Sequence, residues 1–292
     1  MPINIWLNAI RPKTILASIA PVLIGIAMAF GDGGFHAPSA CAALAAAVLI
    51  QIGTNLANDY FDWKNGVDTP ERQKSRPSSI LTGALTPQQV KWGFMTALFL
   101  AGILGGYLMF RAGWPIVIIG IFSITSAILY SAGPWSLAKT GLADLFVFVF
   151  FGPIAVGGTY YVQTFDINGA VILAGCAPGA LSVAILTVNN LRDIKTDTRA
   201  GRKTLPIRFG RSFGRGEYLV SFLTAFLVPP VVTALTGEHH WLSLAALSLL
   251  LLIPVIEIIY TAEDGPTLNK ALASTAKVLL IYSLVFSVAW NI

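Results

Sequence analysis

The chain has 292 residues, of which 55% are hydrophobic and only 11% are charged, and its mean hydropathy is +0.72. An average soluble domain carries about a quarter charged residues, so this composition excludes an ordinary soluble domain and favours a membrane protein. Cys41 and Cys176 lie far apart in apolar stretches and the three histidines fall in short polar connections, so neither a disulfide framework nor a zinc site is indicated.

Nine stretches of the chain are apolar enough to cross a bilayer, a crossing that takes about 20 mostly apolar residues. In chain order they run roughly over Ile15 to Phe30, Ser39 to Ala57, Val90 to Phe110, Pro115 to Gly133, Leu142 to Tyr161, Ala170 to Val188, Tyr218 to Leu235, Trp241 to Tyr260 and Thr275 to Trp290. We therefore predict an all-α fold in which residues 1–292 form a single domain, a bundle of nine transmembrane helices.

The positions of the basic residues indicate the orientation, because cytoplasmic loops accumulate Lys and Arg. Of the 19 Lys and Arg residues, all except Arg111 precede the first stretch or lie in, or at the edge of, connections that follow even-numbered stretches. This bias predicts a cytoplasmic N-terminus in a bacterial-type inner membrane. Membrane topology then explains the net charge of +5, so no nucleic-acid partner is predicted, and no obligate protein partner is inferred.

Prolines and glycines within the stretches add two expectations. Proline removes a helical hydrogen bond, so kinks are predicted at Pro21, Pro153, Pro178, Pro229–Pro230 and Pro254. Small residues let membrane helices approach closely, so close packing is predicted at the glycines Gly102, Gly105, Gly106, Gly157 and Gly158.

Two short segments carry most of the chemical information: QIGTNLANDYFDWKNGVDT after the second stretch and LTVNNLRDIKTDTRAGRKTL after the sixth. Each contains a trio of oxygen-bearing side chains at helical spacing, which we call the first trio and the second trio. The first trio is Asn55, Asp59 and Asp62, and the second is Asn189, Asp193 and Asp197. If the helices continue through these segments, each trio lies along one helical face, and both emerge on the cytoplasmic side.

Two facing groups of carboxylates repel each other at a membrane boundary unless a cation lies between them. Mg²⁺ prefers hard oxygen ligands and usually binds through one or two carboxylates together with substrate phosphates, so the trios indicate a Mg²⁺–diphosphate site. A single aspartate at the end of a span is better explained as a solvated loop residue, but that explanation does not fit two matching trios. Asp68 remains either a further ligand or a turn residue.

Several segments, in the same order, resemble the UbiA superfamily of intramembrane prenyltransferases, whose fold is a nine-helix bundle with Asp-rich motifs after helices 2 and 6. The match covers almost the whole chain and is carried by NLANDYFDWKNGVDT, YSAGPWSLAKTGLAD, FFGPIAVGGTYYVQ and NNLRDIKTDTRAGRKTLPIRFG. These segments are most similar to the branch that prenylates 1,4-dihydroxy-2-naphthoate in menaquinone biosynthesis. Position 66 is glycine where the commoner motif of the superfamily has aspartate, a variation that this branch shares.

The resemblance implies that a polyprenyl group passes from a Mg²⁺-bound polyprenyl diphosphate to an aromatic acceptor. It implies metal binding by Asp59, Asp62, Asp193 and Asp197, with support from Asn55 and Asn189. Basic residues near the trios are candidates for diphosphate contact, although the positive-inside bias explains each of them equally well. They are Arg11, Lys13, Lys64, Lys139, Lys195, Arg202 and Lys203, of which Lys139 and Lys203 are favoured.

Aromatic faces stabilise an allylic carbocation without trapping it. Tyr130 is the favoured candidate because it ends the fourth stretch on the side of the trios, and Phe150 and Phe151 are others. Tyr160 and Tyr161 end the fifth stretch at the opposite side, which argues against contact with the diphosphate.

Two alternatives remain open from the sequence. One is another acceptor within the same superfamily, such as 4-hydroxybenzoate. The other is a secondary transporter, since carboxylates and broken helices within a membrane are also transporter features. A transporter would carry acidic residues near the middle of its spans, whereas both trios fall at span ends.

Overall fold

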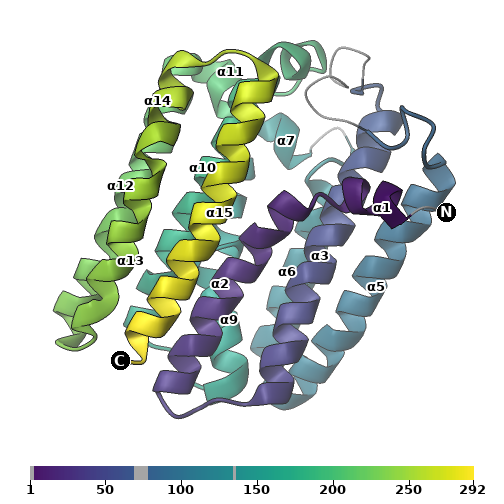
Figure 1. Ribbon diagram of the computed structural model, residues 1–292. Coiled ribbons are helices and arrows are strands. Elements are labelled where there is room, and N and C mark those ends of the chain that lie inside the picture. Colours follow the sequence, from purple (N-terminus) through teal and green to yellow (C-terminus); the bar gives the residue numbers. More distant parts are fainter. Residues whose placement is uncertain (1–2, 69–77, 134–135) are drawn as a thin grey trace.

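The computed structural model of the protein describes residues 3–68, 78–133 and 136–292 (Figure 1). Arg72, Lys74 and Arg76, which contribute to the predicted orientation, lie outside the described residues. Every element in the described part of the chain is a helix. The helices are α1 (Ile3–Ile10), α2 (Pro12–Gly31), α3 (Ala37–Lys64), α5 (Pro87–Ala112), α6 (Trp114–Leu129), α7 (Leu137–Thr140), α8 (Ala143–Phe150), α9 (Pro153–Thr164), α10 (Gly169–Arg199), α11 (Leu205–Phe209), α12 (Arg211–Thr236), η1 (His240–Leu242), α13 (Ser243–Ser248), η2 (Leu249–Leu252), α14 (Ile253–Thr261) and α15 (Gly265–Trp290).

The predicted all-α membrane bundle is confirmed. Within the described residues, eight helical segments are long and apolar enough to cross a membrane, and the shorter apolar helix α6 has 16 residues. Together these nine segments correspond one to one with the nine predicted stretches. The C-terminal helix begins at Gly265 instead of Thr275, so Lys270 lies within α15 together with the exposed Lys277, and neither belongs to the preceding connection.

Capping side chains set where several long helices begin. Thr86 and Gln89 form a capping box at the start of α5, and Asn168 accepts a hydrogen bond from the Val171 amide at the start of α10. Asp264 caps α15 by accepting from the Thr267 amide over 2.9 Å, and this bond lowers the pKa of the Asp264 carboxyl.

Only some of the predicted proline kinks coincide with breaks in a helix. The fifth predicted stretch is two helices, because α8 ends at Phe150 and α9 starts at Pro153. In the eighth predicted stretch, the 3₁₀ helix η2 separates α13 from α14, and Pro254 lies at the start of α14. The other prolines, by contrast, lie inside continuous helices, namely Pro21 in α2, Pro178 in α10 and Pro229–Pro230 in α12. Residues around the break at 151–152 line cavities, as described below.

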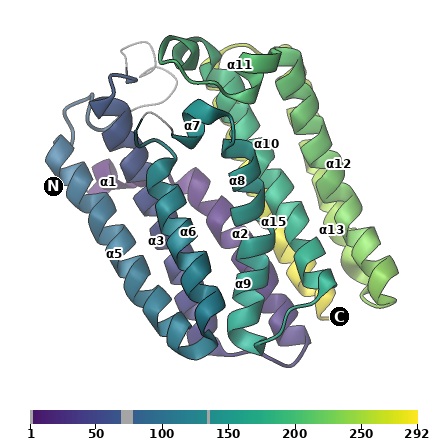
Figure 2. The same cartoon turned by 180° about the vertical axis from the view of Figure 1, so that it is seen from behind.

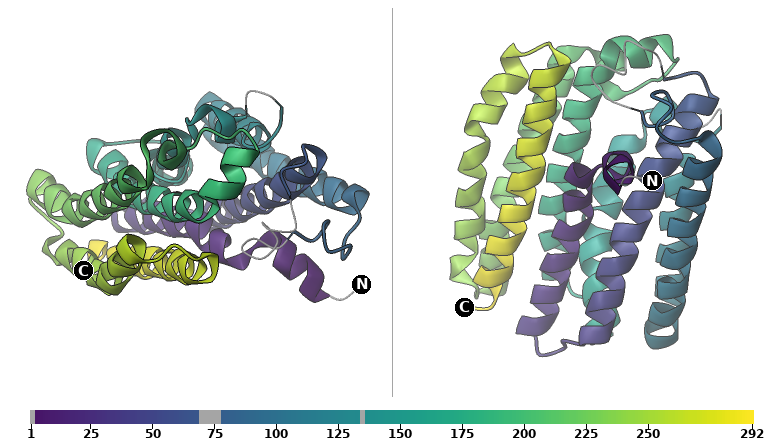
Figure 3. Two further views of the ribbon diagram at one scale, coloured as in Figure 1. Left: turned by 90° about the horizontal axis from the view of Figure 1, so that it is seen from above. Right: turned by 45° about the vertical axis from the view of Figure 1, so that its right-hand side comes forward.

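Two hydrophobic cores flank the centre of the bundle. The larger joins α2, α9, α10, α12 and α15, while the smaller joins α1, α3, α5 and α6. Figure 2 shows α3, α5 and α6 grouped on one side and α10, α12 and α15 on the other, with α8 and α9 between them. The view from above in Figure 3 shows the two groups spread along the long axis of the bundle.

Glycine packing differs from the prediction at three positions. A Cβ added at Gly102, Gly105 or Gly106 would meet no heavy atom within 4 Å, so these residues do not mark a close helix contact. They line a cavity instead. Close packing occurs at Gly157, where an added Cβ would lie 3.0 Å from Ile167 Cδ1. It also occurs at glycines not singled out from the sequence, Gly152, Gly175 and Gly179, where α10 meets the break between α8 and α9.

Candidate active site

Both trios lie on helices that continue past their apolar parts, as the spacing requires. The helix α3 runs to Lys64 and α10 runs to Arg199, so each trio occupies the last turns of one long helix. All four aspartates are buried, with exposed fractions of 2–3%. Buried carboxylates need compensating charge, and the arginines Arg11, Arg192 and Arg202 supply it.

Arg202 brings the two trios together. Its guanidinium donates to Asp62 on α3 and, over 3.3 Å, to Asp197 on α10. Arg202 is itself 8% exposed, so this three-residue network is buried. The trios therefore face each other across the width of a single guanidinium group.

Arg11 pairs with Asp59 from the junction of α1 and α2. The backbone of Arg11 has a φ of 54°, which breaks the helix between Ile10 and Pro12. The side chain of Asn55 donates to the Ile10 carbonyl over 2.7 Å and to Thr14 Oγ1 over 2.9 Å, and so ties α3 to both sides of this break. In this arrangement Asn55 positions the segment that carries Arg11, and its contact with a metal remains a prediction.

A third arginine, Arg192, holds the second trio and was not among the residues predicted from the sequence. It donates to both carboxylate oxygens of Asp193, at 2.8 and 2.6 Å, and to Asn189. It also donates over 2.5 Å to Asn269 of α15. The signal was present in the segment NNLRD, because Arg192 lies three residues after Asn189 and directly before Asp193.

A cavity of about 690 Å³, which we call the polar cavity, opens beside these networks. It is bordered by the α1–α2 junction, α3, the residues after position 77, α8, α10 and α15. The predicted site residues among its lining are Arg11, Lys13, Asn55, Tyr130, Asn189, Asp197 and Arg202. Residues that were not predicted also line it, including Asn58, Ser182, Asn190, Arg192 and Asn269.

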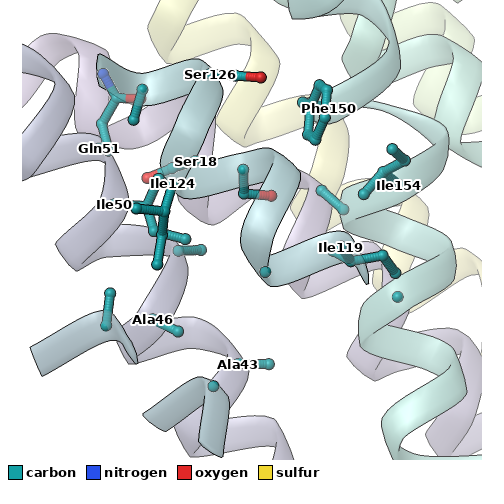
Figure 4. A pocket seen from close by; sticks show the side chains of 18 of the residues that line it. Ser18, Ala43, Ala46, Ile50, Gln51, Ile119, Ile124, Ser126, Phe150 and Ile154 are labelled. Carbon is teal, nitrogen blue, oxygen red and sulfur yellow. The ribbon is translucent and has the colours of Figure 1, made fainter. Parts of the chain in front are cut away.

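A second cavity of about 610 Å³, the apolar cavity, lies between α2, α3, α5, α6, α8 and α9. In Figure 4 its wall includes Ala43, Ala46 and Ile50 from one helix and Ile119, Phe150 and Ile154 from others. The apolar and polar cavities share five lining residues and are therefore neighbours. The shared residues are Gln51, Thr54, Tyr130, Val147 and Phe151.

The other predicted cations and aromatics take varied positions. Lys13, Lys64, Lys195 and Lys203 have exposed side chains, and Lys139 is partly buried at the end of α7. Lys139 and Lys203 are not among the lining residues of either cavity, so their contact with a bound diphosphate stays a prediction. Tyr160 donates over 2.6 Å to Asp32, which follows the C-terminal end of α2. Arg11 lies at the other end of α2, so Tyr160 is far from the trios, as the predicted topology requires.

The donor set around the trios fits a divalent cation that shares its coordination with a substrate. In the described part of the chain no three His, Cys, Asp or Glu side chains are grouped closely enough to hold a metal ion by themselves. Asp62 and Asp197 nevertheless meet on one guanidinium, and Asp68 lies next to Asp62 with a buried Oδ2 that has no hydrogen-bond partner among the described residues. Oxygen donors alone, incomplete without phosphate, are typical of Mg²⁺ sites.

The fold and the site define a class: a multi-pass membrane protein with a buried acidic centre at one end of its helices and an apolar cavity beside it. Residues 18–284 match the UbiA prenyltransferase family. The chain belongs to this family and is a prenyltransferase.

Curated relatives are similar over nearly the full length. Proteins named 1,4-dihydroxy-2-naphthoate octaprenyltransferase are 33% identical in Haemophilus influenzae, covering 98% of this chain and 95% of the relative, and 34% identical in Escherichia coli, covering 96% and 93%. Among solved structures, an apo UbiA homolog from Aeropyrum pernix has a TM-score of 0.71 at 16% identity, covering 94% of this chain and 98% of the homolog. A UbiA homolog from Archaeoglobus fulgidus bound to DMAPP and Mg²⁺ has a TM-score of 0.66 at 15% identity, covering 97% and 99%.

Proposed function

We propose that this protein transfers a polyprenyl group from polyprenyl diphosphate to 1,4-dihydroxy-2-naphthoate with the help of Mg²⁺, releasing diphosphate and CO₂ and forming demethylmenaquinol. The observation that carries the proposal is that Arg202 joins the two trios at the edge of the polar cavity, next to the apolar cavity. The choice of acceptor is supported by the names of the relatives.

The diphosphate would bind between the trios. Arg11, Arg192 and Arg202 already lie there as donors to carboxylates, and guanidinium groups bind phosphate oxygens in the same fork geometry. When metal and substrate bind, Asp59, Asp62, Asp193 and Asp197 would exchange arginine for Mg²⁺, with Asp68 as a candidate further ligand. The arginines released from the carboxylates would then contact the diphosphate.

Bound Mg²⁺ would neutralise the negative charge that develops on the leaving diphosphate. The allylic C–O bond breaks, the ring carbon of the acceptor bonds to the prenyl carbon, and the ring carboxylate leaves as CO₂. Tyr130 and Phe151 line both cavities, so their rings would lie beside the first prenyl unit if the diphosphate binds between the trios. With both substrates bound, the site would have to exclude water that would otherwise capture the carbocation.

The polyprenyl tail would occupy the apolar cavity and continue into the lipid. Isoleucine, alanine, glycine and phenylalanine dominate its wall, and the shared residues connect it to the diphosphate end. With the N-terminus in the cytoplasm, the trios would face the cytoplasmic side of the membrane.

The test is turnover by purified protein in detergent with Mg²⁺, a long-chain polyprenyl diphosphate and either 1,4-dihydroxy-2-naphthoate or 4-hydroxybenzoate, with products identified by mass spectrometry. We expect a decarboxylated prenyl naphthoquinol, and its loss in Asp59→Asn and in Asp193→Asn proteins that still fold. Prenylation of the benzoate alone would reject the proposed acceptor. Full activity in both variants would reject the metal site. If folded protein forms no product with either acceptor, the proposed activity is rejected and the alternative of a secondary transporter is favoured.

A further inference from the structure

Two buried polar groups in the polar cavity wall lack partners and are not explained by diphosphate binding. Ser182 and Asn190 both line this cavity, and each is 4% exposed. The Oγ of Ser182 and the Nδ2 of Asn190 have no hydrogen-bond partner among the described residues. An unpaired buried polar group costs about 1–3 kcal/mol, so such groups in a binding cavity point to a ligand that pairs with them.

The two residues lie on one face of α10. They are eight residues apart, which places them two turns and about 12 Å apart along the helix, with Leu186 between them. Leu186 also lines the polar cavity. This strip of α10 therefore carries a polar, an apolar and a polar side chain in turn, and it faces a cavity whose wall also contains Val147 of α8 and Phe151 of the α8–α9 break.

The pattern fits a flat aromatic molecule with oxygen substituents better than it fits a diphosphate. Ser182 and Asn190 are neutral, whereas the arginines that would meet phosphate charge contact the aspartates near the ends of α3 and α10. Thr204, whose hydroxyl also has no hydrogen-bond partner among the described residues, lies two positions after Arg202 and so belongs to the diphosphate end. Neutral donors beside Leu186 and Phe151 suit a ring that is apolar on its faces and polar at its edges.

We infer that the strip Ser182–Leu186–Asn190 binds the aromatic acceptor. Asn190, the member nearer the arginines, donates to the ring carboxylate, and Ser182, the deeper member, pairs with a ring hydroxyl, while Leu186 contacts the ring face. Both residues are substrate-binding and specificity-determining groups. This inference rests on the proposed function and adds the residues that recognise its acceptor.

The experiment measures equilibrium binding of two ligands to the protein in detergent: 1,4-dihydroxy-2-naphthoate and 1,4-dihydroxynaphthalene, which lacks the carboxylate. Asn190→Ala should weaken naphthoate binding about tenfold or more and abolish the preference for the carboxylate. Ser182→Ala should weaken the binding of both ligands about three- to tenfold and leave the preference for the carboxylate intact. Ser182→Thr, which keeps a hydroxyl, should restore the binding of both ligands. The KM for polyprenyl diphosphate should be unchanged in Asn190→Ala and in Ser182→Ala.

Thermal unfolding and a matched variant separate ligand binding from a structural role. Removing an unpaired group should leave the Tm unchanged or raised, whereas a structural role predicts a lower Tm. The control is Ser283→Ala in α15, since Ser283 is fully buried, its Oγ has no hydrogen-bond partner in the described part of the chain, and it lines neither cavity. This variant should bind both ligands like the wild type.

Three outcomes would overturn the assignment. They are unchanged acceptor binding in both variants, an equal effect of the Ser283 change, and a loss of affinity shared equally by acceptor and diphosphate. Failure of the proposed function would give a different result. The wild type itself would then bind neither 1,4-dihydroxy-2-naphthoate nor 1,4-dihydroxynaphthalene, and it would form no prenyl naphthoquinol.

Discussion

At the scale of single residues, arginines occupy the places where the substrate complex would bring cations. Each of Asp59, Asp62, Asp193 and Asp197 accepts a hydrogen bond from an arginine. A buried carboxylate without compensation is costly, so these pairs let the bundle fold before metal and substrate arrive. Under the proposed function, the same arginines would then be available for the phosphate oxygens.

Replacing Arg202 by alanine tests this dual role. The variant leaves Asp62 and Asp197 facing each other without their shared cation, so we expect about 3–5 kcal/mol of destabilisation without Mg²⁺. Added Mg²⁺ with diphosphate should recover part of this loss, because the ions supply the missing charge. Unfolding of the protein in detergent, with and without these ions, measures both effects.

The control for Arg202→Ala is Lys203→Ala, which removes one positive charge from the adjacent, exposed residue. Its stability should change little, since exposed charges contribute about 0–1 kcal/mol. Equal destabilisation of the two variants would show that general charge loss, and not the bridge between the trios, is responsible.

At the scale of helices, one side-chain amide, that of Asn55, ties both sides of the break between α1 and α2 to α3. Asn55 binds the last carbonyl of α1 and the Thr14 hydroxyl in the first turn of α2. Asn55→Ala should release the junction and let Arg11 move away from Asp59, so we expect faster hydrogen exchange over residues 3–14 and a higher KM for the diphosphate. Mass spectrometry of the exchanged protein locates the effect.

The matched variant for the Asn55 prediction is Thr54→Ala, because the hydroxyl of Thr54 donates to the Ile50 carbonyl within its own helix. Exchange over residues 3–14 should then stay at the wild-type rate. If Asn55→Ala also leaves that rate unchanged, Asn55 does not hold the junction, and the predicted role as a metal or substrate ligand becomes its main role.

Glycines in the helices divide into two kinds that the sequence does not distinguish. A Cβ at Gly179 would lie 2.5 Å from the Phe148 carbonyl oxygen, whereas one at Gly105 meets open space. Gly179→Ala should therefore destabilise the protein by about 1–3 kcal/mol, and Gly105→Ala should be neutral or stabilise it by up to about 1 kcal/mol. Thermal unfolding of both variants decides the matter, and equal effects would contradict the packing described for α10 against the α8–α9 break.

The sequence predicted what depends on periodicity and composition, and missed what depends on contacts between distant segments. Hydropathy located the nine apolar segments, and helical spacing placed each trio on one face of a continuous helix. The pairing of Arg11 with Asp59 is different, because it depends on a left-handed residue that breaks the N-terminal helix. Asn269 joins the site from α15, 77 positions from Arg192, and no local pattern marks it.

At the scale of the whole molecule, the two cores hold two cavities side by side without filling them. The larger core supports α10, which carries the second trio, and the smaller core supports α3, which carries the first. Charge collects in the polar cavity, while the apolar cavity has a wall of aliphatic and aromatic residues. This separation matches a substrate with a charged head and a long hydrocarbon tail.

Filling the apolar cavity should change which substrates react. Gly105 lines this cavity with open space beside it, so Gly105→Phe places a ring where the tail would lie. Each buried CH₂ contributes about 0.8 kcal/mol, so displacing even a few tail carbons should lower kcat/KM for a long polyprenyl diphosphate about tenfold or more. Dimethylallyl diphosphate would end near the shared residues, so it should react at close to the wild-type rate. Competition between the two diphosphates in one reaction measures this ratio directly. An equal loss for both would place the tail outside the apolar cavity, between other helices or directly in lipid.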